Sequence, residues 1–267
     1  MSHLPFIGKK LLVLGGNGYI STAISTMAAS LGAKVTAVTK SGIKRDQKIS
    51  SQVDFISGHP GDLTALEKYL RETDAVIHSM GVVADLLSNK MQTQAGEGAC
   101  EGLNRETAKN LGRFLGTIGG KKMVYLSIMK DPVTSKQTEE LLLKQNLRTC
   151  ILRLGFVNAL NDTKYFKEQK NEKNTTLLTK MALQKFAVTN PFTAETLNSK
   201  IFENCNDVNT IAKGSIYAAF LDEYDGKIIE SRDIAKMVEE HQHLEKFETE
   251  GQGKKGESRI DGEQLSI

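Results

Sequence analysis

Short apolar runs and longer amphipathic stretches alternate along the first 154 residues of the chain. The short runs are rich in Val, Ile and Leu, which is typical of strands buried inside a sheet. In the longer stretches apolar residues recur every three or four positions, which predicts helices with one buried face. The predicted strands are 10–14, 34–39, 53–57, 75–78, 122–127 and 147–154, and the predicted helices are 19–31, 64–73, 103–115 and 137–144. This alternation predicts an α/β fold, a Rossmann-like doubly wound parallel sheet.

Two helix starts carry capping signals. Thr64 and Glu67 have the spacing of a capping box, in which each side chain accepts a backbone N–H of the first turn. Ser231 precedes an amphipathic pattern that continues to Leu244, and we expect its hydroxyl to cap the last helix.

The pattern becomes irregular in two places. Residues 82–102 have no clear period and predict an irregular crossover. Residues 158–206 are polar and rich in Lys, which predicts a small loop-rich C-terminal cover over the strand ends. A helix over 207–224 and a short strand over 226–230 follow. From 247 onward Gly, Lys, Glu, Ser and Gln dominate, so we expect one domain over 1–246 and a disordered tail over 247–267.

A glycine loop joins the first predicted strand to the first predicted helix. Its sequence, Gly15-Gly16-Asn17-Gly18-Tyr19-Ile20-Ser21, has the G-x-x-G spacing of dinucleotide-binding turns. Such a turn lets backbone N–H groups at the start of the helix approach a pyrophosphate. We therefore predict cofactor contacts from Gly15, Asn17, Gly18, Tyr19 and Ile20. The third glycine position of the pattern is Ser21, which is still small.

The end of the second strand bears on the choice between NAD and NADP. A site for NAD usually places Asp or Glu there, on the ribose hydroxyls. This chain instead has Lys40 and Ser41, followed by Lys44 and Arg45. Cations favour the extra phosphate of NADP, so the sequence favours NADP(H) over NAD(H), with Lys40 and Ser41 as contacts. The alternative is that these residues form a solvated loop.

Two further strand ends are predicted to meet the cofactor. Asp62 and Leu63 follow the third strand, where Asp62 can accept a hydrogen bond from the adenine amine or simply cap the next helix. Met80 and Gly81 follow the fourth strand, at the edge where ligands of open parallel sheets bind.

Composition narrows the classes of function. The net charge of +3 is too small to indicate nucleic acid, although it would suit contact with a mildly anionic membrane surface. No stretch approaches the roughly 20 apolar residues of a membrane span. The three cysteines have no metal-ligand spacing, and His241 and His243 do not share a helix face, so we predict no metal site. From the residues alone, the expected location is the cytosol.

Several of these motifs together carry a family resemblance. They are the glycine loop, Gly61-Asp62-Leu63, Ser79-Met80-Gly81, Asn104-Arg105, Ser127 and Arg153-Leu154-Gly155-Phe156-Val157. Over about residues 10–244 the chain resembles a short-chain dehydrogenase/reductase. Within that superfamily it is most similar to the atypical branch, which holds the NDUFA-nine-like subunit of respiratory complex I and an accessory subunit of the mitochondrial coenzyme Q biosynthesis complex.

The resemblance implies a catalytic pattern of Tyr-x-x-x-Lys with an upstream Ser, in which the tyrosine transfers the proton during hydride transfer. It places Ser127 and Lys136 in catalytic positions, and both also at the cofactor. Pro132 stands four residues before Lys136, in the tyrosine position, and cannot transfer a proton. Lys136 either holds the cofactor ribose or is a solvated lysine at a helix start. Gly155, Phe156 and Val157 are implied at the nicotinamide end.

The resemblance therefore implies a binding site without the usual catalytic tyrosine. It predicts an NADP(H)-binding accessory subunit that associates with other coenzyme Q biosynthesis proteins at the matrix face of the mitochondrial inner membrane. Two alternatives remain at this point. One is an NADPH-dependent reductase of a quinone or another carbonyl compound. The other is a structural or nucleotide-sensing subunit of the kind found in complex I.

Overall fold

The computed structural model describes residues 4–44, 51–80, 99–128, 132–158 and 205–244. A parallel sheet of seven strands runs through them in the order β3-β2-β1-β4-β5-β6-β9. The strands are β1 Lys10–Leu14, β2 Lys34–Thr39, β3 Val53–Ser57, β4 Ala75–His78, β5 Lys122–Ile128, β6 Arg148–Leu154 and β9 Ile228–Ile229. This order, with its reversal between β1 and β4, is that of a doubly wound Rossmann sheet and confirms the predicted fold class.

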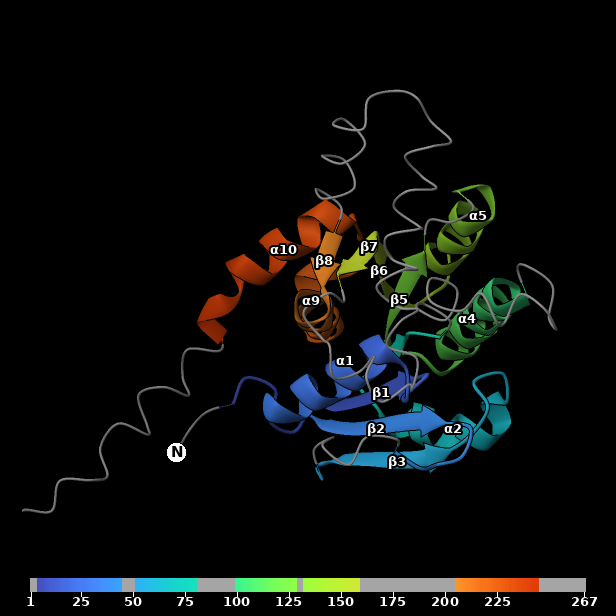
Figure 1. Ribbon diagram of the computed structural model, residues 1–267. Coiled ribbons are helices and arrows are strands. Elements are labelled where there is room, and N and C mark those ends of the chain that lie inside the picture. The colour runs from blue at the N-terminus through green and yellow to red at the C-terminus, as the bar shows by residue number, and fades with distance from the viewer. Residues whose placement is uncertain (1–3, 45–50, 81–98, 129–131, 159–204, 245–267) are drawn as a thin grey trace, which may run out of the picture.

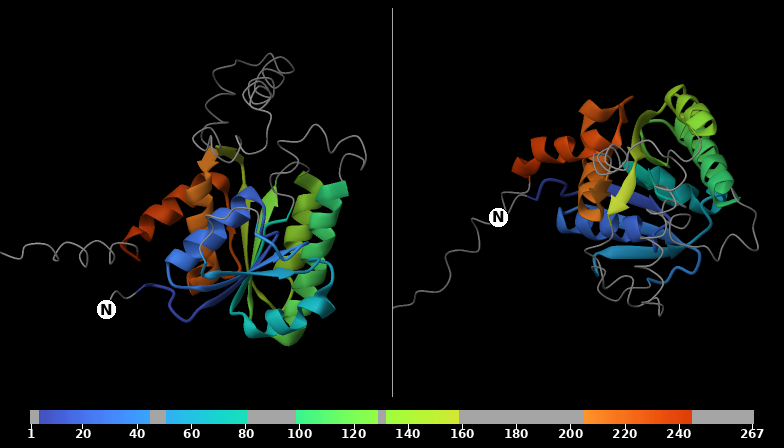
Figure 2. Two further views of the ribbon diagram at one scale, coloured as in Figure 1. Left: turned by 60° about the horizontal axis from the view of Figure 1, so that its bottom comes forward. Right: turned by 45° about the horizontal axis from the view of Figure 1, so that its top comes forward.

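Helices cover both faces of this sheet (Figures 1 and 2). Helices α1 Tyr19–Ser30, α9 Val208–Phe220 and α10 Ser231–Glu240 lie on one face. Helices α2 Leu63–Glu72, α4 Ala99–Ile118 and α5 Pro132–Leu143 lie on the other. Two short 3-10 turns, η2 Asp222–Tyr224 and η3 Gln242–Leu244, follow α9 and α10. None of the described helices is both long and apolar enough to cross a membrane.

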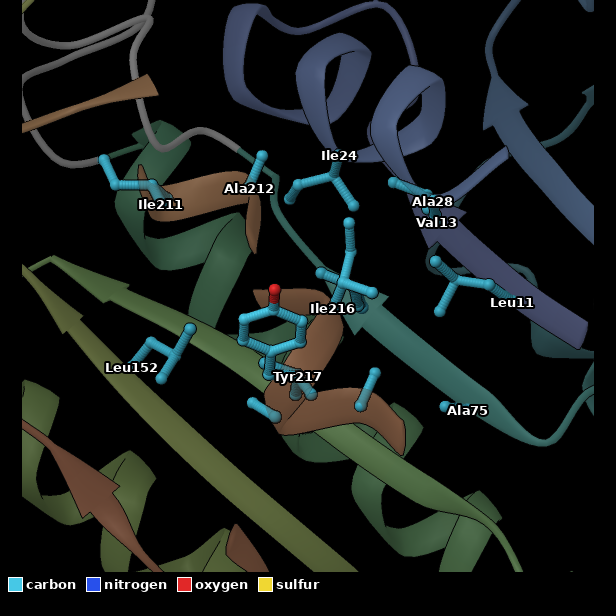
Figure 3. Close-up of a cluster of buried hydrophobic side chains, with 14 of the residues drawn as sticks. Leu11, Val13, Ile24, Ala28, Ala75, Leu152, Ile211, Ala212, Ile216 and Tyr217 are labelled. Carbon is cyan, nitrogen blue, oxygen red and sulfur yellow. The ribbon is translucent and has the colours of Figure 1, made fainter. Parts of the chain in front are cut away.

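The central strand β1 shows why its sequence is apolar at every position after Lys10. Leu11 and Val13 pack into the core beneath α1 and α9, whereas Leu12 and Leu14 pack into the core on the other face. Successive side chains of a strand point to opposite faces, so a strand covered on both sides needs apolar residues throughout. Figure 3 shows Leu11 and Val13 in the first core, near Ile24 of α1.

Both predicted capping signals were wrong. At α2 the N-cap is Asp62, whose Oδ1 accepts the N–H of Ala65 at 3.1 Å, so the helix begins two residues earlier than a capping box with Thr64 as the N-cap implies. At α10 the N-cap is Glu230, which makes no side-chain cap, and Ser231 is the first helical residue. At α2, Asp62 and Thr64 are both good caps within one turn, and spacing alone does not decide between them.

A second, two-stranded parallel sheet was not predicted. It pairs β7 Phe156–Asn158 with β8 Cys205–Asp207, on either side of the expected cover. Strands of three residues are too short to show a period in the sequence. Residues 82–98 of the expected crossover (82–102), most of the cover (159–204) and the expected tail (247–267) lie outside the described residues, and the one-domain division stays a prediction. The prediction of irregular structure was wrong for 99–102, which begin α4.

An ion cluster closes the amino-terminal edge of β5 and β6. Lys122, buried at the start of β5, places Nζ 2.5 Å from both Asp225 Oδ1 and the carbonyl oxygen of Leu221. Arg148, at the start of β6, donates to Asp222 and, at 2.6 Å, to Asp225. Burial alone would raise the pKa of Asp225, but the hydrogen bonds from Lys122 and Arg148 lower it. The cluster fixes the turn after α9 against the sheet.

Replacing the buried lysine tests this closure. We expect Lys122→Met to lower the free energy of unfolding by about 2 kcal/mol, less than for a fully buried pair because Asp225 keeps Arg148 as a partner. Urea denaturation measures the change. Lys144→Met is the matched control, because Lys144 is exposed and lies 3.9 Å from Glu140; its effect should stay within about 0.5 kcal/mol. Equal stabilities of the two variants would contradict the structural role of Lys122.

Candidate dinucleotide site

The turn after β1 brings the start of α1 against the end of β4. Gly15 has a φ of +93°, a left-handed conformation that favours glycine. A Cβ on Gly15 would lie 3.3 Å from the carbonyl oxygen of Ser79 and 3.4 Å from Cα of Met80. The predicted contacts Gly15 and Met80 are therefore neighbours in space, whereas Gly81 lies outside the described residues.

The start of α1 is open to an anion. Gly18 is the N-cap and provides no side chain, and no acidic residue stands in the first turn. Its N–H bonds to the carbonyl oxygen of Gly15 at 2.9 Å, which closes the turn. The following N–H groups begin a helix, where the helix dipole and unpaired donors favour a phosphate. Tyr19 and Ile20 are buried, so their backbone rather than their side chains would meet a ligand.

The turn after β2 lies beside this loop. A Cβ on Gly16 would lie 2.8 Å from Cβ of Ala37 in β2, and Asn17 Nδ2 donates to the carbonyl oxygen of Ile43 at 2.9 Å. The side-chain amide of Asn17 thus links the glycine loop to the segment that follows β2. Such a link fixes the spacing between the glycine loop and the turn after β2.

Internal hydrogen bonds hold the segment after β2 in shape. Thr39 Oγ1 accepts the N–H of Gly42 at 3.0 Å, and Ser57 Oγ donates to the carbonyl oxygen of Lys40 at 3.0 Å. Lys40 and Ser41 are exposed on this turn. Residues 39–44 include no carboxylate. The turn therefore presents a cation and a hydroxyl where NAD sites present an acid.

Asp62 and Leu63 lie at the next strand end. Asp62 caps α2, which matches the alternative given for it above, and the predicted adenine contact stays a prediction. Leu63 is half-buried and packs against the core beneath α2.

A buried polar group lies where β4 meets α4. His78 Nε2 lies 2.9 Å from Thr107 Oγ1, and Thr107 in turn donates to the carbonyl oxygen of Asn104 at 3.0 Å. Burial lowers the pKa of His78 to about 4, so the imidazole is neutral near pH 7. Asn104 Oδ1 is buried without a hydrogen-bond partner. An orphaned acceptor of this kind, one turn from Thr107, whose hydroxyl lies 4.0 Å from Met80 Sδ, fits a ligand hydroxyl or amide. Asn104 is not among the predicted contacts.

Ser127 belongs to an ion network that the sequence did not indicate. Its hydroxyl is fully buried and donates to Glu139 Oε1 at 2.7 Å. Arg153 donates to both carboxylate oxygens of Glu139 and, at 2.6 Å, to Glu230. Hydrogen bonds to Glu139 and Glu230 raise the pKa of Arg153, although burial opposes the shift. The network joins β5, α5, β6 and the start of α10.

Lys136 lies on the exposed face of α5, and its predicted contact with the cofactor ribose stays a prediction. The buried face of α5 consists of Ser135, Thr138, Glu139 and Leu142. Lys136 is exposed, as is Glu140 one turn later. Residues four apart on a helix share a face, and on the buried face of α5 the residue four before Glu139 is Ser135. Lys136 comes one residue later, so a Tyr-x-x-x-Lys pair that ends at Lys136 would not lie on the buried face. Pro132 is the first residue of α5, a position that proline favours.

The segment after β6 enters the second sheet. Phe156 and Val157 form β7 and pair with Cys205 and Asn206, while Gly155 connects β6 to β7. Val157 packs against the core beneath α1 and α9. This geometry places the segment at the carboxyl edge of β6, as expected, and a nicotinamide contact stays a prediction.

Other reactive side chains take part in packing. Among the described residues no three His, Cys, Asp or Glu side chains group as metal ligands. Burial raises the pKa of the Cys150 thiol to about 12, which makes it a poor nucleophile. His241 bonds to Glu223 at 2.7 Å, on the surface near η3.

Comparisons with known proteins agree with a dinucleotide site. Residues 11–127, somewhat under half of the chain, match the model of the NAD dependent epimerase/dehydratase family. No curated protein matches the sequence. This family match agrees with the short-chain dehydrogenase/reductase resemblance, while the atypical branch within it stays a prediction.

Solved structures share the fold at low identity. WbmF of Bordetella bronchiseptica, solved with NAD+ and UDP, is 16% identical, with 88% of this chain and 77% of that chain covered and a TM-score of 0.54. The UDP-Glc/GlcNAc 4-epimerase of Campylobacter jejuni is 17% identical, with 87% and 83% covered and a TM-score of 0.52. Against WbmG of Bordetella bronchiseptica, solved with NAD, this chain spans about half of the other protein's length, 53%.

At these identities the structural likeness establishes the fold and no activity. The matched segment, 11–127, contains the glycine turn, the turn after β2, the ends of β3 and β4 and all of β5 except Ile128. Residues 11–127 therefore carry the sequence pattern of the NAD dependent epimerase/dehydratase family, on a chain with a Rossmann fold.

Proposed function

We propose that this chain is a member of the NAD dependent epimerase/dehydratase family that binds NADP(H) and holds it as an accessory subunit, without tyrosine-dependent hydride transfer. The observation that carries the proposal is the Gly15–Gly18 turn, which sets the uncapped start of α1 beside the end of β4. When bound, the nicotinamide supplies a hydride donor or acceptor. The relatives solved with NAD or NAD+ support a nicotinamide dinucleotide as the ligand.

The residues of this chain fit such a ligand from end to end. The first turn of α1 would bind the pyrophosphate, and the exposed Lys40 and Ser41 would meet a phosphate on the adenosine ribose. Asn104 Oδ1 would accept a hydrogen bond from the nicotinamide half, since this oxygen is buried and otherwise unpartnered.

The residues at the expected catalytic positions favour binding of the cofactor without hydride transfer. Ser127 donates its only proton to Glu139, and Arg153 neutralises that carboxylate with a bidentate ion pair. The Ser127 hydroxyl is therefore engaged in a buried hydrogen bond to a carboxylate that Arg153 already holds. Neither Pro132, four residues before Lys136 in the sequence, nor Asp131, four residues before Ser135, is a tyrosine. The reductase alternative needs a proton donor that these positions do not provide.

The resemblance to the atypical branch gives the proposal its biological setting. It favours an accessory role among coenzyme Q biosynthesis proteins at the matrix face of the mitochondrial inner membrane. The small positive charge of the chain is compatible with a peripheral contact to anionic lipid. Native purification of the tagged full chain from its own cells tests this setting. Recovery of coenzyme Q biosynthesis proteins supports it, and recovery of complex I subunits instead would favour the structural alternative.

The cofactor preference is tested by reversing the charge after β2. We expect Lys40→Glu to weaken NADP+ binding by about tenfold or more, because a carboxylate repels the ribose phosphate, while NAD+ binding changes less than about twofold. Isothermal titration calorimetry gives both dissociation constants. Lys34→Glu, on the exposed amino end of the same strand, is the control and should change neither. An unchanged NADP+ affinity in Lys40→Glu would contradict the proposed preference.

The role of Ser127 is tested by removing its hydroxyl. We expect Ser127→Ala to lower the free energy of unfolding by about 1 to 2 kcal/mol, because Glu139 loses a buried partner but keeps Arg153. NADP+ affinity should stay within about twofold of the wild type. Ser30→Ala, at an exposed serine bonded to its own helix, is the control for stability. NADPH oxidation by a short-chain quinone that disappears in Ser127→Ala would favour the reductase instead.

A further inference from the structure

Ser21 occupies the third glycine position of the loop motif, and its hydroxyl is buried. The residue is only 1% exposed, on the face of α1 that meets the sheet. A buried hydroxyl is costly unless it is hydrogen-bonded, so a serine at this position needs partners close by.

Two hydrogen bonds satisfy the Ser21 hydroxyl and connect three elements. Ser21 Oγ donates to the carbonyl oxygen of Gly15 at 2.6 Å. Ser79, directly after β4 and 6% exposed, places its own Oγ 3.0 Å from Ser21 Oγ. Because the proton of Ser21 is engaged with Gly15, Ser79 is the donor in the contact between the two hydroxyls, and it shares its single proton between Ser21 Oγ and the carbonyl oxygen of Leu14. The Ser79 hydroxyl also lies 2.8 Å from the carbonyl oxygen of Leu14.

The chain of hydroxyls runs through the inside of the glycine turn. The carbonyl oxygen of Gly15 accepts both the N–H of Gly18, at 2.9 Å, and the hydroxyl of Ser21. A Cβ on Gly18 would lie 2.9 Å from Ser21 Oγ, so the hydroxyl occupies the space that a side chain at Gly18 would need. The turn is thus held from within, although three of its four residues are glycines with wide conformational freedom.

We propose that Ser21 and Ser79 are positioning residues of the phosphate loop. They hold Gly15 in its left-handed conformation in the nucleotide-free protein, and so keep the start of α1 aimed at the ligand position. Such preorganisation raises affinity because the loop does not have to be ordered on binding. The inference rests on the proposed function, since it assigns these hydroxyls a role in binding a dinucleotide.

The test compares Ser21→Ala and Ser79→Ala with a matched control, Thr73→Val. The hydroxyl of Thr73 links the same two strands at their opposite ends, because it is placed 2.9 Å from the carbonyl oxygen of Lys10 and 3.0 Å from that of Ala75. Thr73 is likewise buried. All three substitutions therefore remove a buried hydroxyl between neighbouring elements, and only two of them touch the glycine turn.

Two measurements on the full chain separate positioning from general stability. Without nucleotide, the backbone amides of Gly16 and Gly18 should exchange hydrogen faster in Ser21→Ala and Ser79→Ala than in Thr73→Val. The comparison is made under conditions in which the three variants have the same free energy of unfolding. The NADP+ dissociation constant should rise about five- to thirtyfold in the two serine variants and less than about twofold in Thr73→Val.

Exchange at Gly16 and Gly18 that matches the Thr73→Val control would overturn the inference, as would unchanged NADP+ binding in both serine variants. A wild-type protein that binds no dinucleotide would instead contradict the proposed function. In that case the exchange rates alone decide whether the hydroxyls order the turn.

Discussion

The fold of the site depends on one backbone turn, in which Gly15 leaves β1 in a left-handed conformation. This turn reverses the chain so that α1 begins directly beside the end of β4, at the point where the strand order of the sheet reverses. The N–H groups of the first helical turn then point to the edge where open parallel sheets bind their ligands. Ser21, Ser79 and the amide of Asn17 connect this turn to its neighbours, so the binding half of the site is built as one unit.

Two ion networks lie at opposite ends of β5 and β6, and they stabilise different parts of the structure. At the amino ends, Lys122, Arg148 and Asp225 join the turn after α9 to the sheet, far from the carboxyl edge. At the carboxyl ends, Arg153 and Glu139 take the place where the resemblance expects catalytic chemistry. The second network stabilises the packing of α5 and α10 on the sheet but commits the Ser127 hydroxyl to a neutralised carboxylate.

Much of the fold was predictable, because the central strands are buried on both faces and their sequences are therefore runs of apolar residues. β1, β2, β3 and β4 begin and end where the apolar runs do. Helix caps were less predictable, since Asp62 and Thr64 are both good caps within one turn. The Lys136 assignment came from spacing in sequence, whereas the helical phase that exposes it depends on which face of α5 meets the sheet. The role of Glu139 could not be predicted from the sequence. Its partners Ser127 and Arg153 are far apart in the sequence and become neighbours only when β5 pairs with β6.

A crystal structure of the full chain with NADP+ tests most directly whether the glycine turn binds the nucleotide. We expect the pyrophosphate oxygens to lie within hydrogen-bond distance of the backbone N–H groups that begin α1, and the ribose phosphate to lie beside Lys40. A nucleotide bound away from the Gly15–Gly18 turn, or a turn that changes its conformation to admit it, would contradict the account.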